Sequence, residues 1–266
     1  MKTLKKIAFL AVMTVSPTFS AAEEASNSEL PFVAGRPGNT ESPIAVPKGY
    51  FQVESGLASY TYDNASGFRS WSLAQTSFRY GVGHDTDIQL VVQPYSRIHD
   101  KNANQTFQGF GNTTLRALHT FMGADGSSPS FGLIGFVTLP TAAKQLRDNG
   151  IFSDRVEGGV IATGSTNLTE KASLTITLGD ASRRWNNSYV SDVSGGANLT
   201  YAVTEQFGAY VEAFADHFEH LPTATTADLG VTYLLSRVTQ LDAGVNIGAN
   251  HATPDASFFV GWSHRF

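Results

Sequence analysis

Few residues in this sequence have the type and spacing that covalent or metal chemistry requires. The chain has no cysteine, so disulfides, thiolate metal sites and cysteine nucleophiles are all excluded. Two of its seven histidines lie in the stretch His217-Phe218-Glu219-His220, whose composition suggests a metal site. A metal site needs a further fixed ligand, and we expect this stretch to lie in an exposed loop. We therefore predict no bound metal and no cofactor.

Hydrolytic chemistry is equally poorly represented. A catalytic triad brings a serine, a histidine and an acid or amide together. His264 and His119 fall on the apolar parity of their predicted strands, which suits a membrane-interface residue better than a catalytic base. The sequence contains no nucleophile elbow, phosphate-binding glycine loop or zinc-protease motif. We predict that the protein is not an enzyme.

The charged residues do show a pattern, because they recur at alternate positions within segments of about ten residues. The clearest segment is Gln240–Asn250, where Leu241, Val245 and Ile247 alternate with polar residues such as Asp242 and Asn246. Successive side chains of a strand point to opposite faces, so this segment predicts one apolar and one polar face. The same alternation predicts about twelve strands, near residues 50–62, 68–80, 87–98, 108–122, 130–139, 155–165, 171–180, 189–202, 207–216, 226–235, 240–250 and 256–266.

The length of these segments favours a transmembrane β-barrel over a soluble β-sandwich. Sandwich strands average about 5–6 residues, whereas a tilted strand needs about 9–11 residues to cross a bilayer. The connections after even-numbered strands are short, and several after odd-numbered strands are longer: His99–Phe107, Pro140–Asp154 and Ala181–Ser188. Short periplasmic turns and longer external loops are typical of outer-membrane barrels, and twelve strands place both termini in the periplasm.

The N-terminus predicts export. Lys2, Lys5 and Lys6 precede a short apolar run that ends in small residues, which is typical of a signal peptide over residues 1–22. The alternative, a membrane anchor, requires roughly 20 apolar residues. Residues 23–48 contain four prolines and no alternation, so we expect a Pro-rich periplasmic leader or a partial plug of the barrel. Residues 49–266 form the predicted barrel.

Net charge excludes one class of partner. Removing residues 1–22 takes away three lysines and no acid, which changes the net charge from −5 to −8. An acidic chain lacks the clustered Lys and Arg that nucleic acids require, so we expect no nucleic-acid partner.

Charges of both signs share one parity of the predicted strands. An Arg or Lys in mid-membrane costs about 2–4 kcal/mol on the lipid face, so these residues are expected to face the barrel interior. Two interpretations stay open: a wet, selective passage, or a salt-bridged polar interior that only fills the barrel. The predicted lumen-lining residues are Glu54, Arg79, Arg97, Asn112, Arg116, Glu157, Asp192, Glu212, Asp228, Asp242 and Arg265.

The last predicted strand ends at the final residue of the chain. Counting back in twos from that end gives a mostly aromatic or apolar stripe, which fits an interfacial aromatic girdle. The stripe also resembles the terminal signature that outer-membrane barrels present to the barrel-assembly machinery. It consists of Phe258, Val260, Trp262, His264 and Phe266.

A series of short motifs, in order along the chain, resembles one family. They are Arg36-Pro37-Gly38, Glu41-Ser42-Pro43, Val46–Glu54, Phe78–Val82, Gly109–Thr113, Leu139-Pro140-Thr141, Leu241–Val245 and Gly261–Phe266. The family is named putative MetA-pathway of phenol degradation, and the resemblance runs from about residue 35 to the end. The chain departs from the family pattern at Asn112, where Asp is expected, and at Thr141-Ala142, where Thr-Gly is expected.

The resemblance implies a barrel in the bacterial outer membrane, surrounded by its lipid and linked by name to aromatic-compound metabolism. We predict a passive channel for small molecules, with apolar or aromatic ones as the class that the name suggests. Two alternatives stay open: a structural or surface-interaction barrel with a filled lumen, and a lipid-modifying outer-membrane enzyme.

Overall fold

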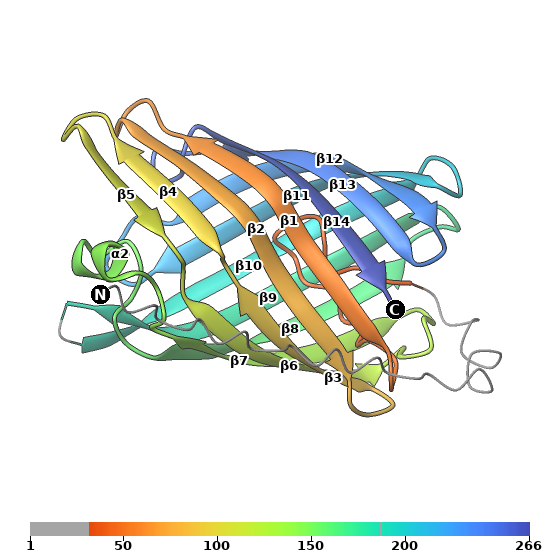
Figure 1. Cartoon of the computed structure of the whole chain (residues 1–266). Helices are drawn as coiled ribbons and strands as arrows, with labels where there is room; N and C mark the ends of the chain where they lie inside the picture. The colour runs from red at the N-terminus through yellow and green to blue at the C-terminus, as the bar shows by residue number, and fades with distance from the viewer. Residues whose placement is uncertain (1–31, 187) are drawn as a thin grey trace, which may run out of the picture. The chain divides into compact units, whose positions relative to one another are not determined.

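The computed structural model describes residues 32–186 and 188–266, and the predicted signal peptide lies outside them. The described chain is one antiparallel sheet that closes on itself, because β1 pairs with both β14 and β2. Figure 1 shows the resulting barrel. Closure leaves no continuous free edge, which is how a β-structure can satisfy its backbone within lipid.

The barrel has twelve strands, as the alternation predicted, although two of them are interrupted. β3 and β4 form one barrel strand with a break at Gln93-Pro94, and β5 and β6 form the next with a break at residues 110–112. The strands are β1 Phe51–Tyr62, β2 Phe68–Gly81, β3 Thr86–Val92, β4 Tyr95–Asp100, β5 Gln105–Gly109, β6 Thr113–Met122, β7 Ser130–Leu139, β8 Glu157–Asn167, β9 Ala172–Trp185, β10 Ser188–Ala202, β11 Phe207–Phe218, β12 Ala224–Ser236, β13 Thr239–Gly248 and β14 Ala256–Arg265.

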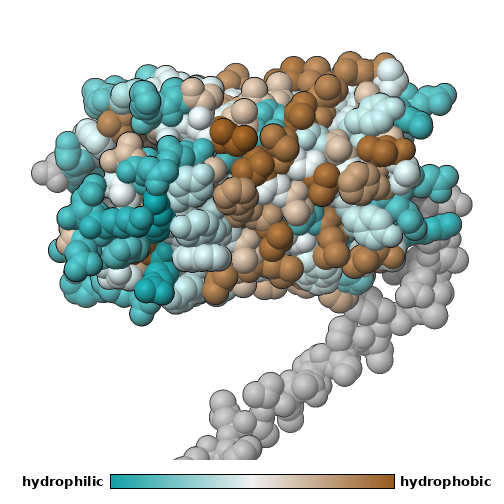
Figure 2. Space-filling view, turned by 90° about the horizontal axis from the view of Figure 1, so that it is seen from above, coloured by the Kyte–Doolittle hydropathy of each residue, from teal (hydrophilic) through white to brown (hydrophobic). Residues whose placement is uncertain are grey.

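The two faces of the sheet differ in polarity. Large apolar side chains such as Ile88, Leu115 and Ile176 are exposed on the outside, while the buried residues are mostly polar or charged. Figure 2 shows apolar residues over the middle of the barrel and hydrophilic residues gathered at one end. This arrangement is the reverse of a soluble sandwich, whose apolar side chains face inward, and it is the arrangement that a lipid environment requires.

Aromatic rings on the outside form clusters toward both ends of the strands. Phe51 stacks with Phe78 near the C-terminus, with ring centroids 6.2 Å apart, and Tyr60 contacts Trp71 farther along the same two strands at 4.6 Å. Amphipathic rings settle where a membrane meets water, so the two clusters mark the two interfaces. We call the end that carries Phe51 and the C-terminus the periplasmic end.

The connections at the external end differ from those predicted. Strand β4 extends to Asp100 and β5 begins at Gln105, while β9 extends to Trp185, which pairs with Ser188 of β10. Two of the three predicted long loops are therefore largely strand. The prediction failed because these strand ends rise beyond the membrane, where the outward face is polar and alternation disappears. Residues 140–156 do form a long connection, which contains the short helix α2 Lys144–Asp148. Among the described residues no helix is long and apolar enough to cross a membrane.

Candidate functional site

Residues 32–48, which we call the N-terminal segment, lie inside the barrel. They contact strands on all sides: Arg36 pairs with β13, Thr40 with β11, and Val46 with β3. Further hydrogen bonds join Glu41 to Thr177 of β9 and Ile44 to Arg79 of β2. A short segment that reaches strands around the whole circumference can lie only in the lumen. The alternation of the sequence gave no information on this placement.

One end of the N-terminal segment is held by an ion pair. Arg36 donates from Nη2 to Oδ1 of Asp242 at 2.9 Å and from Nε to Oδ2 at 3.2 Å. This two-bond geometry is the strong form of the arginine–carboxylate contact. Gly261 makes room for it, since a Cβ there would lie 2.4 Å from the Arg36 guanidinium. Gly261 of β14 therefore leaves room for the guanidinium to lie against the wall in this position.

Glu212 of β11 holds the middle of the segment. Its two carboxylate oxygens accept bonds from the backbone and side chain of Asn39 and from the backbone and hydroxyl of Thr40, at 2.8–3.0 Å. Asn198 donates a fifth bond at 3.1 Å. The segment turns at Gly38, whose φ of +97° favours glycine. A buried carboxylate with five donors is well satisfied, and it ties two consecutive residues to one point of the wall.

A buried triad lies where the segment runs toward β1. Arg79 of β2 is paired with Glu54 at 2.8 Å and with Asp87 at 2.6 Å. Each carboxylate also accepts a backbone bond from the segment: Glu54 from Gly35 and Asp87 from Val46. The triad therefore joins three barrel strands to the N-terminal segment through charge-assisted bonds.

A small apolar patch completes the packing of the segment. Ala45 packs with Leu118 of β6 and Ile134 of β7, all of them buried. Thr120 beside them donates to the Pro43 carbonyl at 2.7 Å and accepts from the Ala45 amide at 2.9 Å. Residues 43–45 are thus held against β6 and β7 both by apolar packing and by hydrogen bonds to the backbone.

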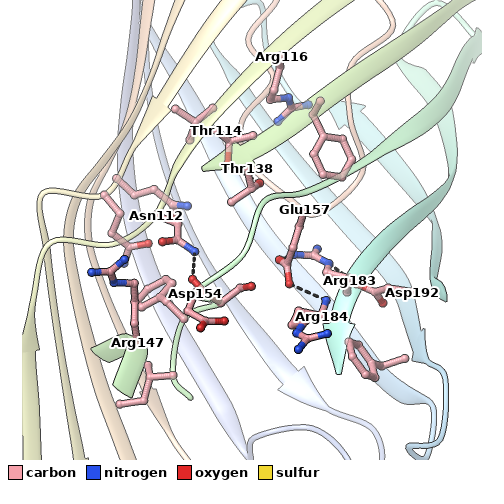
Figure 3. A pocket seen from close by; sticks show the side chains of 18 of the residues that line it. Asn112, Thr114, Arg116, Thr138, Arg147, Asp154, Glu157, Arg183, Arg184 and Asp192 are labelled. Atoms are coloured by element: carbon pink, nitrogen blue, oxygen red, sulfur yellow. Dashed lines mark hydrogen bonds and ion pairs between the residues drawn. The ribbon is translucent and has the colours of Figure 1, made fainter. Parts of the chain in front are cut away.

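The lumen contains separate spaces on the two sides of the N-terminal segment. The outer cavity, of about 700 Å³, lies toward the external end. Figure 3 shows Asn112, Arg147 and Asp154 on one side of it and Glu157, Arg183 and Asp192 on the other. Arg183 bridges Asp192 at 2.7 Å and Glu157 at 3.4 Å. Phe136, Ile151 and Phe152 add apolar surface, so the cavity presents both charges and rings.

The inner cavity, of about 360 Å³, lies toward the periplasmic end. It is lined by the segment itself, by the turn that contains Ser127, and by polar residues such as Asn198 and Thr200. The segment is part of its lining, while Arg116, paired with Glu41 at 2.7 Å, borders the outer cavity. The N-terminal segment therefore lies between the outer and inner cavities.

The structure places the predicted lumen residues as follows. Glu54, Arg79, Glu212 and Asp242 contact the N-terminal segment, and Arg116 pairs with its Glu41. Asn112, Glu157 and Asp192 line the outer cavity. Asp228 is buried and accepts a bond from the Tyr210 hydroxyl at 3.0 Å. Arg265 is buried, with its guanidinium 5.3 Å from the Tyr50 ring.

The prediction that Arg97 lines the lumen is wrong, because Arg97 is exposed on the outer face of the barrel. It pairs in register with Trp71, which also faces outward. The break at Gln93-Pro94 shifts the alternation by one residue, so that Gln89 points inward but Arg97 does not. A one-residue slip moves every following side chain to the other face.

Several interior charges were missing from the sequence-based set. Asp87 shares the parity of Gln89 and could have been found by extending the alternation one step. Arg183 lies in a stretch that had been expected to be a loop. Arg36, Glu41 and Arg147 lie outside strands, where alternation gives no signal.

The terminal stripe, His217 and His264 lie in the barrel wall. Phe258, Val260 and Phe266 are exposed outward, and the His264 ring lies 5.8 Å from Trp262 and 4.4 Å from Phe266. His217 belongs to β11, not to a loop, and its Nδ1 lies 3.0 Å from the Thr223 hydroxyl. Within residues 32–186 and 188–266, no three His, Asp or Glu side chains are arranged to hold a metal ion.

Comparison with known proteins fits this architecture. The family model described as putative MetA-pathway of phenol degradation matches residues 34–266. The chain belongs to this family. The match begins within the N-terminal segment and includes the whole barrel, so the family comprises the segment together with the strands that hold it.

Solved structures share the fold of this family member. An outer membrane channel from Pseudomonas putida F1 matches with a TM-score of 0.64 and 15% identity, over 87% of this chain and 99% of that one. The NanC porin matches with a TM-score of 0.53 and 9% identity, over 80% and 98%. No curated protein matches by sequence. The fold and the apolar outer face identify a barrel of the bacterial outer membrane, surrounded by its lipid.

Proposed function

We propose that this barrel is a passive channel for small molecules and that the N-terminal segment is its plug. The observation that carries the proposal is the position of the segment between the outer and inner cavities. Displacing it would join two cavities that are each large enough to hold several water molecules. Barrels of about eight strands are filled by side chains, and barrels of 16 strands enclose an open channel. A twelve-stranded barrel is intermediate in width, so its lumen can hold a plug whose removal would leave a passage.

The proposed cargo is a small molecule with apolar or aromatic character. The family name links the chain to phenol degradation, and the outer cavity offers Phe136 and Phe152 beside arginines and carboxylates. Its volume falls within the roughly 300–1,000 Å³ typical of small-molecule sites. Salt-bridged charges such as Arg183 with Asp192 give the passage a mixed field without a dominant sign.

A second candidate is a barrel whose lumen stays filled and whose external loops do the work. The many hydrogen bonds between the segment and the wall favour this candidate. Glu212 alone accepts four hydrogen bonds from the segment and a fifth from Asn198 of β10. We propose no catalytic activity for either candidate. A single Ser or His substitution that abolished hydrolysis of phospholipid by the pure protein would contradict this.

Single-channel conductance distinguishes the two candidates. The refolded mature chain and a chain lacking residues 23–48 would be compared in planar bilayers. A channel with a plug predicts a low or intermittent current for the mature chain and a larger, steady current for the truncated one. Absence of current from both, despite a heat-modifiable folded band on a gel, would favour the filled barrel.

A further inference from the structure

Arg116 of β6 lies where the N-terminal segment separates the two large cavities. Its side chain lines the outer cavity, while its partner Glu41 lines the inner one. Nη2 of Arg116 lies 2.7 Å from Oε1 of Glu41. Among the described residues, Glu41 carries the only carboxylate within ion-pair distance of this arginine. The pair therefore forms part of the partition between the two spaces.

The Arg116–Glu41 contact leaves the arginine incompletely bonded. Arg36 binds Asp242 through Nε and Nη2, with one hydrogen bond from each atom. The same edge of Arg116 is buried, and neither atom donates a hydrogen bond within the described chain, because the close contact with Glu41 is not in line with an N–H bond. Buried donors without acceptors are costly. A carboxylate that approached this edge in line would satisfy both donors.

Apolar side chains line the outer cavity beside Arg116. Phe136 of β7 lies directly opposite Arg116 in the register of the two strands, and both line the cavity. Val91 of β3 and Ile161 of β8 add aliphatic surface to the same cavity. A carboxylate bound to Arg116 can therefore carry a ring that packs against Phe136, in the offset or edge-to-face arrangements that aromatic rings prefer.

The charged cluster elsewhere in the outer cavity is matched within the barrel wall. Arg183 pairs with Asp192 at 2.7 Å and with Glu157 at 3.4 Å, and all three belong to strands. Figure 3 shows this cluster apart from Arg116, which lies at one end of the cavity. The counter-charge of Arg116 differs, because Glu41 belongs to the N-terminal segment. Arg116 can therefore exchange its carboxylate without any change in the wall.

Arg147 of α2 is the alternative anion site in this cavity. Its Nε is also buried without a hydrogen bond to the described chain, but its Nη1 donates to the Pro140 carbonyl at 3.0 Å. Arg116 is favoured because both atoms of its carboxylate-binding edge lack an acceptor. The two sites also differ in consequence: Arg147 pairs with no residue of the N-terminal segment, so an anion bound to it would displace none of the segment's contacts.

We propose that a small aromatic acid binds in the outer cavity with its carboxylate on the Nε–Nη2 edge of Arg116, in place of Glu41, and with its ring against Phe136. This inference rests on the proposed channel function and deepens it by naming the class of cargo and the event that loosens the plug. Binding of the acid and the Arg116–Glu41 pair exclude each other, so each weakens the other by the same factor. Cargo that enters from outside thus releases one of the contacts that hold the N-terminal segment.

Binding of benzoate to the folded, full mature chain is the first test. Titration calorimetry in detergent would compare benzoate with benzamide, which has the same ring and no charge. Glu41→Gln should tighten benzoate binding by about tenfold, because it removes the competing carboxylate. Arg116→Gln should weaken it by at least about tenfold, because charge-assisted bonds are lost. The affinity for benzamide should change little in either variant.

Matched controls remove the same charges outside the cavity. Glu170→Gln, in an exposed periplasmic turn, and Arg155→Gln, at the external surface, should leave the affinity for benzoate unchanged. A larger loss of affinity for Arg147→Gln than for Arg116→Gln would overturn the assignment, as would equal affinities of Glu41→Gln and the unmodified chain. Glu41→Gln lies outside the strands, so it decides the question even if Arg116→Gln gives no heat-modifiable folded band.

Cleavage of the N-terminal segment tests whether binding loosens the plug. A protease added at the periplasmic end of the folded barrel should cut the segment about fivefold faster in saturating benzoate. Arg116→Gln should be cut faster from the start and should not respond to benzoate. Benzoate that binds through Arg116 without changing cleavage would overturn the release step.

Neither readout depends on current, so failure of this inference and failure of the channel are distinguishable. A truncated chain that does not conduct would reject the channel, whatever the affinity for benzoate. A truncated chain that conducts, together with benzoate binding that is insensitive to Arg116 and Glu41, would retain the channel and reject the aromatic acid as the ligand that loosens its plug.

Discussion

Arg36 and Asp242 form a two-bond ion pair although 206 residues separate them in the sequence. The Asp242 side chain is 0% exposed, while Arg36 keeps partial contact with solvent. Asp242 belongs to the wall and Arg36 to the N-terminal segment, so the pair joins a fixed element to the proposed plug. A buried carboxylate that loses its partner is left uncompensated, which makes this contact costly to break.

Arg36→Leu should therefore weaken the hold on the plug. We expect the open probability of the full mature chain to rise by about tenfold, which corresponds to about 1.4 kcal/mol. Single-channel recording measures this directly. Arg69→Leu is the matched control, because Arg69 donates its hydrogen bonds to Asp63, Asn64 and Phe68 at an external turn. Equal gating in the two variants would contradict the role of the Arg36–Asp242 pair.

Glu212→Gln should release the middle of the N-terminal segment. The amide replaces one acceptor oxygen with a donor that faces the Asn39 and Thr40 amides, so at least one of the five bonds is lost. We expect faster cleavage of the segment by a protease added at the periplasmic end of the folded barrel. Glu205→Gln, in an exposed periplasmic turn, controls for the loss of one negative charge. Unchanged cleavage would show that Glu212 does not hold the segment.

Arg79→Met should destabilise the barrel more than it affects gating. It leaves Glu54 and Asp87 without their shared cation, at a cost of about 3–5 kcal/mol. Urea unfolding of the refolded protein, followed by the gel shift of the folded form, measures the loss. Combining Arg79→Met with Glu54→Gln and Asp87→Asn should restore part of the stability, because no buried charge then lacks a partner. Arg155→Met removes an exposed pair at 3.8 Å and should cost less than about 1 kcal/mol.

The strands were predictable from sequence because apolar and polar residues alternate within each strand, independently of the other strands. A segment such as Gln240–Asn250 alternates over its whole length, and lipid outside with a polar lumen inside enforces that alternation. The inference fails where a strand breaks. Pro94 interrupts the third barrel strand, the parity changes, and Arg97 faces outward. A proline indicates where a strand can break, but it does not indicate by how many residues the register shifts.

The N-terminal segment was not predictable in the same way. Its contacts, such as Arg36 with Asp242 and Val46 with Asp87, join irregular chain to distant strands. No periodic pattern encodes such pairs. The sequence therefore favoured neither of the two alternatives for residues 23–48, a periplasmic leader or a plug.

Phe266 should matter more for assembly in cells than for folding in detergent. Its amide donates to the Phe51 carbonyl at 2.7 Å across the seam where β14 meets β1, and its ring lies 6.0 Å from the Phe51 ring. If the terminal stripe is what the assembly machinery recognises, deleting Phe266 should lower the folded protein in the outer membrane several-fold, while refolding of the purified chain changes little. Phe131→Ala, at an exposed ring of β7 that lies outside the stripe, is the matched control. An equal loss in cells and in detergent would show instead that Phe266 acts through the stability of the seam.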